Sequence, residues 1–278
     1  MARLTVPEIK ATKGVRRLVS LTAYDAPTAR LAEQAGIDIL LIGDSVAMVV
    51  LGHDTTIAVT MDEMLHHTRA VVRGSERAHV VLDMPFMSYQ CSDDDAMRNA
   101  GRALKEGGAV SVKLEGGERL APLVARMVDA GIPVMGHVGL RPQSVNQVGG
   151  FVTQGKDIVS AEQVIADAKA LADAGAFAMV LEKVPAELGT YVTSAVRVPT
   201  IGIGSGAGCD GQVLVVHDAL GYIDGFHPRH ARKYLSLAGQ VRDALQEYAG
   251  DVREGRFPAA EHSVSAAPEL ADHLRRRT

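Results

Sequence analysis

Ala35-Gly-Ile-Asp-Ile-Leu-Leu-Ile-Gly-Asp-Ser45 is the segment that decides the fold, because it joins a helix end, a buried strand and a polar turn. Gly36 follows an amphipathic stretch, and glycine in the left-handed conformation is a frequent residue just after a helix. The run from Ile39 to Ile42 is apolar throughout, which is typical of a parallel strand covered on both faces. We therefore predict a helix over Pro27–Ala35 that leads into a buried strand over Ile37–Gly43.

The same unit of strand, turn and helix recurs along the chain. The predicted strands are Leu18–Tyr24, Ile37–Gly43, His79–Met84, Ala109–Leu114, Ile132–His137, Ala176–Glu182, Thr200–Ile203 and Val213–His217. The helices between them are predicted over Pro27–Ala35, Met61–Arg73, Asp93–Glu106, Arg119–Ala130, Ser160–Ala174 and Ala186–Val196. Eight such units predict an α/β fold, a (β/α)8 TIM-type barrel with a parallel sheet. A doubly wound open sheet remains the alternative, because alternation alone does not establish closure.

The C-terminal part continues past the eighth unit. We predict one further helix over His230–Tyr248 and an extended tail over Phe257–Thr278 with an arginine-rich end. No Pro/Gly/Ser-rich or charged stretch is long enough to link two domains. The expected organisation is a single catalytic domain over residues 1–262, followed by a mobile tail over residues 263–278.

Composition argues against several classes of protein. The 278 residues are 47% hydrophobic, which is enough for a large core, and the net charge of -4 argues against a nucleic-acid partner. Cys91 and Cys209 stand far apart, so neither a disulfide scaffold nor a thiolate zinc site is expected. No apolar stretch approaches the ~20 residues of a membrane span, and the N-terminal residues do not resemble a signal peptide. We expect a cytoplasmic protein without a membrane partner.

Charged and polar residues stand at the ends of five successive predicted strands. They are Asp44, Asp83, Lys113 with Glu115, His137, and Glu182. In a (β/α)8 barrel the C-terminal ends of all strands meet at one face, where reactive groups lie. Each residue alone has an ordinary explanation as a helix cap, a turn residue or a solvated group. Together they predict a functional site, because several charges in a barrel mouth are costly unless they pair, bind a metal or do chemistry.

These residue types fit a hard cation and an oxo acid. Asp44 and Asp83 offer oxygen ligands without accompanying Cys or paired His, which suits Mg2+ with waters and substrate oxygens completing its shell. Glu115 is expected to hold a metal-bound water. Such a metal would chelate a 2-oxo acid and stabilise its enolate. Lys113 would stabilise charge on the same oxygen or form a Schiff base, and the adjacent metal site favours the electrostatic role.

A glycine-rich segment, Gly202-Ile-Gly-Ser-Gly-Ala-Gly208, follows the seventh predicted strand. Barrels often build a phosphate-binding loop at this place, but tight turns that allow close packing explain the glycines equally well. The segment does not follow a first strand with a ribose-binding acid, so it is not a dinucleotide-binding motif.

Six runs of the sequence are each long enough to compare with known families. They are Gly43-Asp-Ser-Val-Ala-Met-Val49, Val59-Thr-Met-Asp-Glu-Met64, Asp83-Met-Pro-Phe-Met-Ser-Tyr89, Val112-Lys-Leu-Glu-Gly-Gly117, Gly136-His-Val-Gly-Leu-Arg-Pro-Gln-Ser144 and Ile201-Gly-Ile-Gly204. The chain resembles the ketopantoate hydroxymethyltransferases, also called 3-methyl-2-oxobutanoate hydroxymethyltransferases, in all six. The resemblance extends roughly from Thr5 to His262, and long runs in the right order are far more specific than one short motif.

The resemblance implies a (β/α)8 enzyme of pantothenate synthesis that assembles as a homodecamer. Such an enzyme uses Mg2+ and 5,10-methylenetetrahydrofolate to add a hydroxymethyl group to 3-methyl-2-oxobutanoate, giving 2-dehydropantoate. The residues that match the family's functional positions are the metal ligands Asp44 and Asp83 with Glu115 as the acid beside them, the oxo-acid contacts Asp44, Ser45, Asp83 and Lys113, the proton acceptor Glu182, and the active-site histidine His137.

Lys183 directly follows the proposed proton acceptor, Glu182. Successive side chains of a strand point to opposite faces. We therefore expect the Lys183 side chain to point away from the face that carries Glu182.

Two other functions fit the strand-end residues. An enzyme of the phosphoenolpyruvate mutase and isocitrate lyase type also uses Mg2+ and an oxo-acid-like enolate in a barrel, but it predicts no folate dependence. A catalytically inactive barrel that senses a metabolite predicts oxo-acid binding without turnover.

Overall fold

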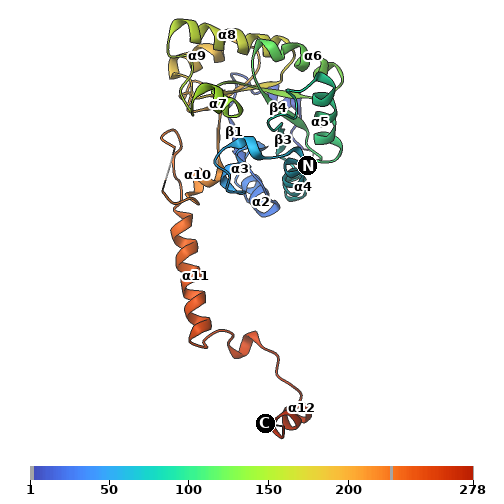
Figure 1. The fold of residues 1–278 in the computed structure, drawn as a ribbon, viewed down its shortest axis with the longest axis vertical. Coiled ribbons are helices and arrows are strands. Elements are labelled where there is room, and N and C mark those ends of the chain that lie inside the picture. Colours follow the sequence, from blue (N-terminus) through green and yellow to red (C-terminus); the bar gives the residue numbers. More distant parts are fainter. Residues whose placement is uncertain (1–2, 226–227, 278) are drawn as a thin grey trace.

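Eight parallel strands pair in chain order and close into a barrel in the computed structural model, which describes residues 3–225 and 228–277 (Figure 1). The strands are β1 Leu18–Thr22, β2 Ile39–Ile42, β3 His79–Asp83, β4 Ser111–Glu115, β5 Val134–Gly139, β6 Ala178–Glu182, β7 Thr200–Ile203 and β8 Gly211–Leu214. β1 pairs with both β2 and β8, so the sheet has no edge. The predicted TIM barrel is confirmed, and the open sheet is excluded.

The predicted helices cover the outside of this barrel (Figure 1). They are α2 Ala26–Gln34, α4 Met61–Gly74, α5 Asp93–Lys105, α6 Ala121–Asp129, α8 Ile158–Asp173 and α9 Ala186–Ala195. Side chains at the N-termini explain where several begin: Asp25 accepts a hydrogen bond from the Thr28 N–H at 2.7 Å. Gly36, Gly131 and Gly175 follow three of these helices at φ 87°, 84° and 99°, as predicted.

Several short elements were not predicted. They are α1 Val6–Lys10, α3 Val46–Val49, α7 Val145–Val148, α10 Val216–Leu220 and the 3-10 helices η1 Thr56–Ala58, η2 Glu118–Leu120, η3 Pro142–Ser144 and η4 Ala260–His262. The eighth strand was predicted over Val213–His217, but His217 lies in α10. The ladder stops earlier because the Val216 N–H donates to Thr22 Oγ1 at 3.0 Å instead of to a strand carbonyl.

Strand alternation divides the apolar residues into two layers. In β2, Ile39 and Leu41 pack inside the barrel, whereas Leu40 and Ile42 pack against the surrounding helices. The same alternation turns every second residue of β3 to β6 toward the barrel axis. Apolar side chains fill most of the lower part of the interior, with the uncharged His79 and Ser111 among them, and the charged residues that face inward lie near the C-terminal strand ends.

The helix α1 closes the lower end of the barrel. Ile9 of α1 is fully buried in the interior cluster. His79 of β3 connects this closed lower end, which we call the floor, to the strands. Its Nδ1 donates to the Leu4 carbonyl at 2.9 Å, and its Nε2 accepts from Ser111 Oγ of β4 at 2.8 Å. Burial lowers the pKa of His79 to about 4, so the bridge is a neutral imidazole.

The C-terminal residues form an arm that projects from the barrel, and its helices are α11 Leu237–Arg253 and α12 Pro268–Arg275 (Figure 1). The helix predicted over His230–Tyr248 begins later and ends at Arg253. Before it, Tyr234 N donates to the Ala219 carbonyl of α10 at 2.7 Å, and in its first turn Ala238 N donates to the Gly221 carbonyl at 3.0 Å. The prediction of an extended chain over Phe257–Thr278 was wrong where α12 forms.

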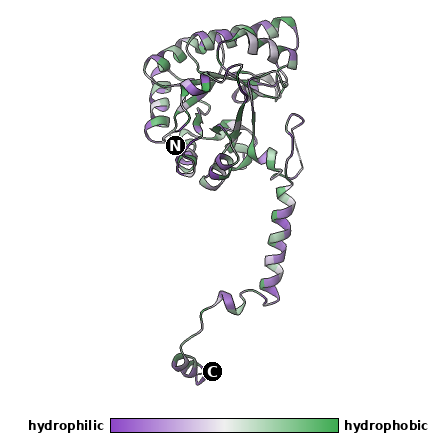
Figure 2. Ribbon diagram, turned by 180° about the vertical axis from the view of Figure 1, so that it is seen from behind, coloured by the Kyte–Doolittle hydropathy of each residue, from purple (hydrophilic) through white to green (hydrophobic). Residues whose placement is uncertain are grey.

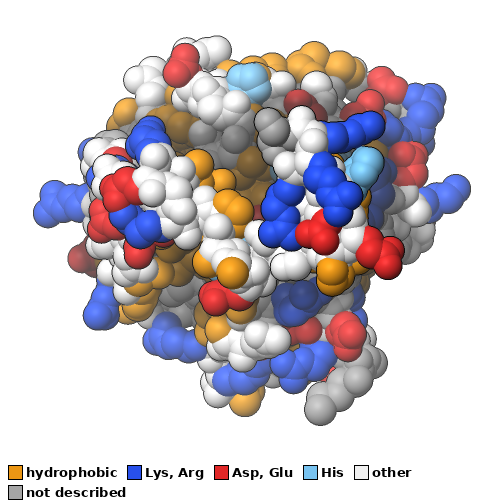
Figure 3. Space-filling model, turned by 90° about the horizontal axis from the view of Figure 1, so that it is seen from below, with side chains coloured by type: hydrophobic (Ala, Val, Ile, Leu, Met, Phe, Trp, Pro, Cys, Tyr) orange, Lys and Arg blue, Asp and Glu red, His pale blue; other side chains and the backbone are white. Residues whose placement is uncertain are grey.

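The surface of the arm is mixed in character. None of the residues of α11 is buried, and hydrophobic and hydrophilic residues alternate along it (Figure 2). On the face seen along the arm, basic, acidic and apolar side chains are interspersed, so this face carries no field of a single sign (Figure 3). Within residues 3–225 and 228–277, no helix is both long and apolar enough to cross a membrane.

Candidate active site

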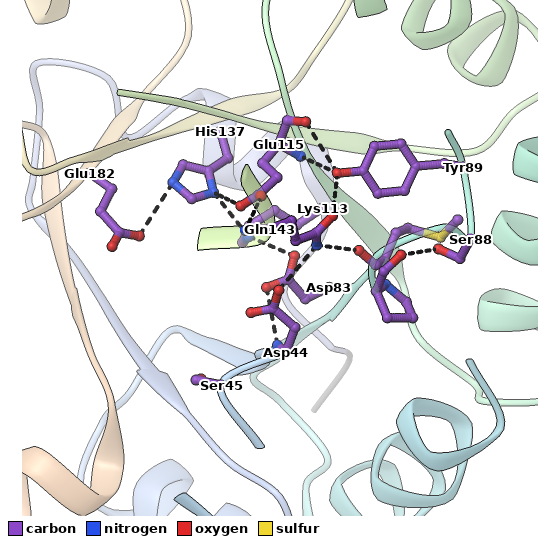
Figure 4. A network of polar contacts seen from close by, with 12 residues as sticks. Asp44, Ser45, Asp83, Ser88, Tyr89, Lys113, Glu115, His137, Gln143 and Glu182 are labelled. Atoms are coloured by element: carbon purple, nitrogen blue, oxygen red, sulfur yellow. Dashed lines mark hydrogen bonds and ion pairs between the residues drawn. The ribbon is translucent and has the colours of Figure 1, made fainter. Parts of the chain in front are cut away.

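The strand ends bring all the predicted polar residues into one cluster at the top of the barrel (Figure 4). Asp83, Glu115 and Glu182 are the last residues of their strands, and Asp44 follows β2 by two residues. The outward-facing neighbours Leu82, Leu114 and Leu181 pack in the helix-facing core, which fixes the inward direction of the polar side chains.

Lys113 carries a positive charge at the centre of this cluster. Its Nζ lies 2.6 Å from Asp83 Oδ1, and both side chains are buried. Burial opposes the charge on Lys113, but Asp83, Asp44 and Glu115 outweigh it and raise the pKa of the amine above its ordinary value. Because a protonated amine is not a nucleophile, the electrostatic role is favoured over a Schiff base.

His137 connects the two sides of the cluster. Its Nδ1 lies 3.2 Å from Lys113 Nζ and 3.4 Å from Glu115 Oε2, and its Nε2 lies 3.3 Å from Glu182 Oε2. Burial and Lys113 disfavour the imidazolium, but the contacts with Glu115 and Glu182 raise the pKa of His137 to about 9. A charged imidazole between two carboxylates would orient the Glu182 carboxylate.

The negative charge of Asp44 and Asp83 is only partly compensated by the positive groups around them. Burial raises the pKa of Asp44 well above its ordinary value, and repulsion from Asp83 and Glu115 raises it further. Burial raises the pKa of Asp83 as well, although Lys113 partly offsets the effect. A divalent cation between the two carboxylates would remove this penalty.

The carboxylates of Asp44 and Asp83 fit a hard cation whose remaining coordination positions are filled by water and substrate. In the part of the chain that the structure describes, no three His, Cys, Asp or Glu groups stand together as a ready metal cage. Two carboxylates completed by waters and substrate oxygens are the usual environment of Mg2+. Glu115 has protein contacts at both oxygens, since Oε1 accepts from the Gln143 N–H at 2.7 Å.

Two residues of the cluster were missed by sequence reasoning, Gln143 and Tyr89. Gln143 Nε2 donates to Asp44 Oδ2 at 3.1 Å and to the Met84 carbonyl at 2.9 Å. Tyr89 Oη lies 2.9 Å from Gln143 Oε1, and burial raises the pKa of this phenol well above its ordinary value. Both residues lie in the runs that carry the family resemblance, but they are neutral, so a search for charged strand ends does not find them.

A cavity of about 670 Å3 opens above the cluster. Among the predicted site residues, its lining includes Asp44, Ser45, Asp83, Lys113, His137 and Glu182. Ser45 Oγ lies 2.9 Å from Tyr24 Oη at its edge. Glu115 is not part of the lining, so it would act on the cavity through His137 and Gln143.

Lys183 does not lie where strand alternation predicted it. It lines the same cavity as Glu182. The strand β6 ends at Glu182, and Lys183 has a left-handed backbone conformation with φ 44°, so the alternation does not continue to it. The expectation that its side chain points away from this face was wrong.

The sequence model of the ketopantoate hydroxymethyltransferases matches residues 3–260. The chain belongs to this family. A curated relative from Carboxydothermus hydrogenoformans, named 3-methyl-2-oxobutanoate hydroxymethyltransferase, is 55% identical over 99% of this chain and 100% of its own length. A relative of the same name from Syntrophobacter fumaroxidans is 57% identical over 98% of this chain and 96% of its own length. The protein is therefore an enzyme, a hydroxymethyltransferase of this family.

Solved structures of other enzymes share the fold of this chain. Phosphonopyruvate hydrolase aligns with a TM-score of 0.63 at 14% identity, covering 100% of this chain and 98% of that one. A 2,3-dimethylmalate lyase of the PEP mutase/isocitrate lyase superfamily aligns with a TM-score of 0.59 at 16% identity, covering 99% and 95%. At sequence identities this low, the similarity shows a common barrel fold and nothing about function.

Proposed function

We propose that the enzyme transfers a hydroxymethyl group from 5,10-methylenetetrahydrofolate to 3-methyl-2-oxobutanoate and gives 2-dehydropantoate, a step of pantothenate biosynthesis. The names of the relatives support the oxo acid as the acceptor. One observation carries the mechanism: a single cavity has Asp44, Asp83 and Lys113 on one side and the Glu182–His137 pair on another (Figure 4).

The first side of the cavity would hold the oxo acid. Asp44 and Asp83 would bind Mg2+, which would supply Lewis-acid stabilisation of negative charge on the keto oxygen. Gln143 holds Asp44 in place, and Glu115 supports the site through Gln143 and His137. The buried ammonium group of Lys113 would stabilise the same developing charge, and Ser45 would donate a hydrogen bond at the edge of the site.

The second side would move the proton. Glu182 would remove the C3 proton of the oxo acid, and His137, 3.3 Å from Glu182 Oε2, would hold the carboxylate in position. The C3 carbon of the resulting enolate would then attack the methylene carbon of the folate, so that a C–C bond forms while one C–N bond of the methylene group breaks. The hydroxyl of one water would replace the second nitrogen on this carbon. The proton held by Glu182 and the remaining proton of the water would go to the two folate nitrogens, so that tetrahydrofolate leaves as the second product.

Turnover of the purified protein tests this function directly. Incubation with 3-methyl-2-oxobutanoate, methylenetetrahydrofolate and Mg2+ should give 2-dehydropantoate by mass spectrometry, and exhaustive EDTA treatment should abolish the product until Mg2+ is returned. Product formation without folate, or binding of the oxo acid without product, would reject the proposal.

We also propose a setting for the enzyme. Unpaired Cys91 and Cys209 are consistent with the reducing cytoplasm. The family resemblance supports a homodecamer. The resemblance extends to about residue 262, which supports residues 1–262 as the catalytic domain and residues 263–278 as a mobile tail outside that domain.

A further inference from the structure

Lys183 is a charged residue of the cavity that the proposed chemistry does not use. A left-handed conformation is unfavourable for a lysine and persists where the surroundings hold it. Here the Lys183 N–H donates to the Ile203 carbonyl at 2.8 Å, and its carbonyl accepts from the Gln154 N–H at 2.9 Å. Gly204 leaves room for the stem, since a Cβ there would lie 3.3 Å from Lys183 Cγ.

The side chain makes a second connection to the same neighbouring loop, residues 151–154, which we call the mouth loop. Lys183 Nζ donates to the Phe151 carbonyl at 3.1 Å and lies 5.7 Å from the centroid of the Phe151 ring. The backbone of Lys183 thus holds one end of the mouth loop, and its ammonium group holds the other. Phe151 and Thr153 of this loop line the active-site cavity.

The mouth loop lies on the part of the cavity that the co-substrate needs. A cavity of about 670 Å3 is much larger than a five-carbon oxo acid requires, and it lies within the usual range of roughly 300–1,000 Å3 for larger ligands. With the oxo acid at Asp44, Asp83 and Lys113, the donor carbon must approach from the solvent side. Phe151, 41% exposed, offers an aromatic face there.

We propose that Lys183 is a positioning residue that holds the mouth loop in place for the folate co-substrate. The inference rests on the proposed function for the identity of the co-substrate. Lys183 and Glu182 then have different roles. Glu182 removes the proton, whereas the ammonium group of Lys183 contacts Phe151 and holds the mouth loop.

Kinetics of the holoenzyme with Mg2+ test this role. Lys183→Met keeps the stem and removes the charge, so KM for methylenetetrahydrofolate should rise about tenfold, the loss expected for one charge-assisted hydrogen bond. Exchange of the C3 proton of 3-methyl-2-oxobutanoate with D2O, measured without folate, should stay within about twofold of the wild-type rate. Lys183→Arg, which keeps a cationic donor, should restore most of the folate affinity.

Amide hydrogen exchange tests the loop without turnover. Exchange of a peptide covering residues 149–157 should be about tenfold faster in Lys183→Met than in the wild type. Lys156→Met is the matched control, because Lys156 is an exposed lysine of the same region, and it should leave loop exchange and KM unchanged. If Lys183→Met does not fold, Lys183→Gly removes the same ammonium group while relaxing the backbone.

The outcomes separate this inference from the proposed function. Unchanged loop exchange in Lys183→Met, or an equal effect in Lys156→Met, overturns the positioning role. Slower proton exchange in D2O would assign Lys183 to the base instead and also overturn it. If the wild type does not turn over folate, the proposed function fails, while loop exchange still decides whether Lys183 holds the mouth loop.

Discussion

Lys113 determines the charge balance of the active site. It lies among buried acids and contacts Asp83 at 2.6 Å, so its loss would leave the buried Asp83 carboxylate without its ion-pair partner. The sequence predicted this cluster because charged residues at consecutive strand ends are conspicuous. Gln143 and Tyr89 were not predictable in that way, because a neutral side chain shows its importance only through the partners that the fold brings to it.

Replacement of the proposed base should separate proton removal from ligand binding. In Glu182→Gln the size is kept and the accepting charge is lost, so C3 proton exchange in D2O should fall by ~10²–10⁴. Binding of Mg2+ and oxo acid should persist, since the residues on the other side of the cavity are unchanged. NMR of the C3 proton measures the rate, and exchange at the wild-type rate would identify another group, such as His137, as the base.

Replacement of Gln143 should weaken the metal site without touching a ligand atom. Gln143→Ala removes the hydrogen bond to Asp44 Oδ2, and loss of such an orienting contact typically costs ~10–100-fold in metal affinity. Titration calorimetry with Mg2+ in the presence of oxo acid measures it. Gln147→Ala, at an exposed glutamine nearby, is the control, and equal affinities in the two variants would contradict the role of Gln143.

At the scale of elements, the long strands and helices followed the sequence pattern closely. β7 has the predicted bounds, and the six main helices differ from prediction by only a few residues at their ends. The short helices α1, α3, α7 and α10 were not predictable, because five or fewer residues carry no periodicity and depend on contacts from elsewhere. The direction of the Lys183 side chain was not predictable for a similar reason, because it depends on the backbone conformation just after β6 ends.

The floor that α1 closes should make stability depend on pH through His79. The pKa of His79 falls from 6.5 to about 4 on folding, so the unfolded chain binds more protons between these values. Stability should therefore be intact above pH 6.5 and decrease as the pH falls toward 4, by roughly 3 kcal/mol for this group.

Urea unfolding of the wild type and His79→Gln between pH 4 and 7 measures this contribution. Glutamine keeps a donor and an acceptor but does not titrate, so its stability should change less steeply with pH. Parallel curves for the two proteins would show that His79 does not cause the dependence.

At the scale of the whole molecule, the arm carries apolar surface that the chain itself does not cover. On α11, Leu245, Tyr248 and Val252 are 61%, 55% and 47% exposed, and their spacing places them along one side of the helix. A groove of about 590 Å3 runs beside them, lined in part by Tyr222 and Arg242. Such a stripe is typical of a surface that another protein chain buries.

The proposed homo-oligomer predicts a mass far above that of one chain. Light scattering at micromolar concentration should give many times 29.4 kDa. Introducing charge into the stripe with Leu245→Glu and Val252→Glu should lower that mass, whereas Asp243→Ala, at an exposed position on the opposite side of α11, should not. A monomeric wild type would contradict the assembly.

The position of α1 determines how the enzyme can be attached to a support. Leu4 N donates to the Arg77 carbonyl at 2.7 Å, which places Leu4 beside the beginning of β3, while the active-site cluster lies at the other ends of the strands. A bead or sensor chip coupled beside Leu4 would therefore face the end of the barrel that α1 closes and leave the catalytic opening toward the solution. Immobilised enzyme of this kind should retain access to both of its substrates.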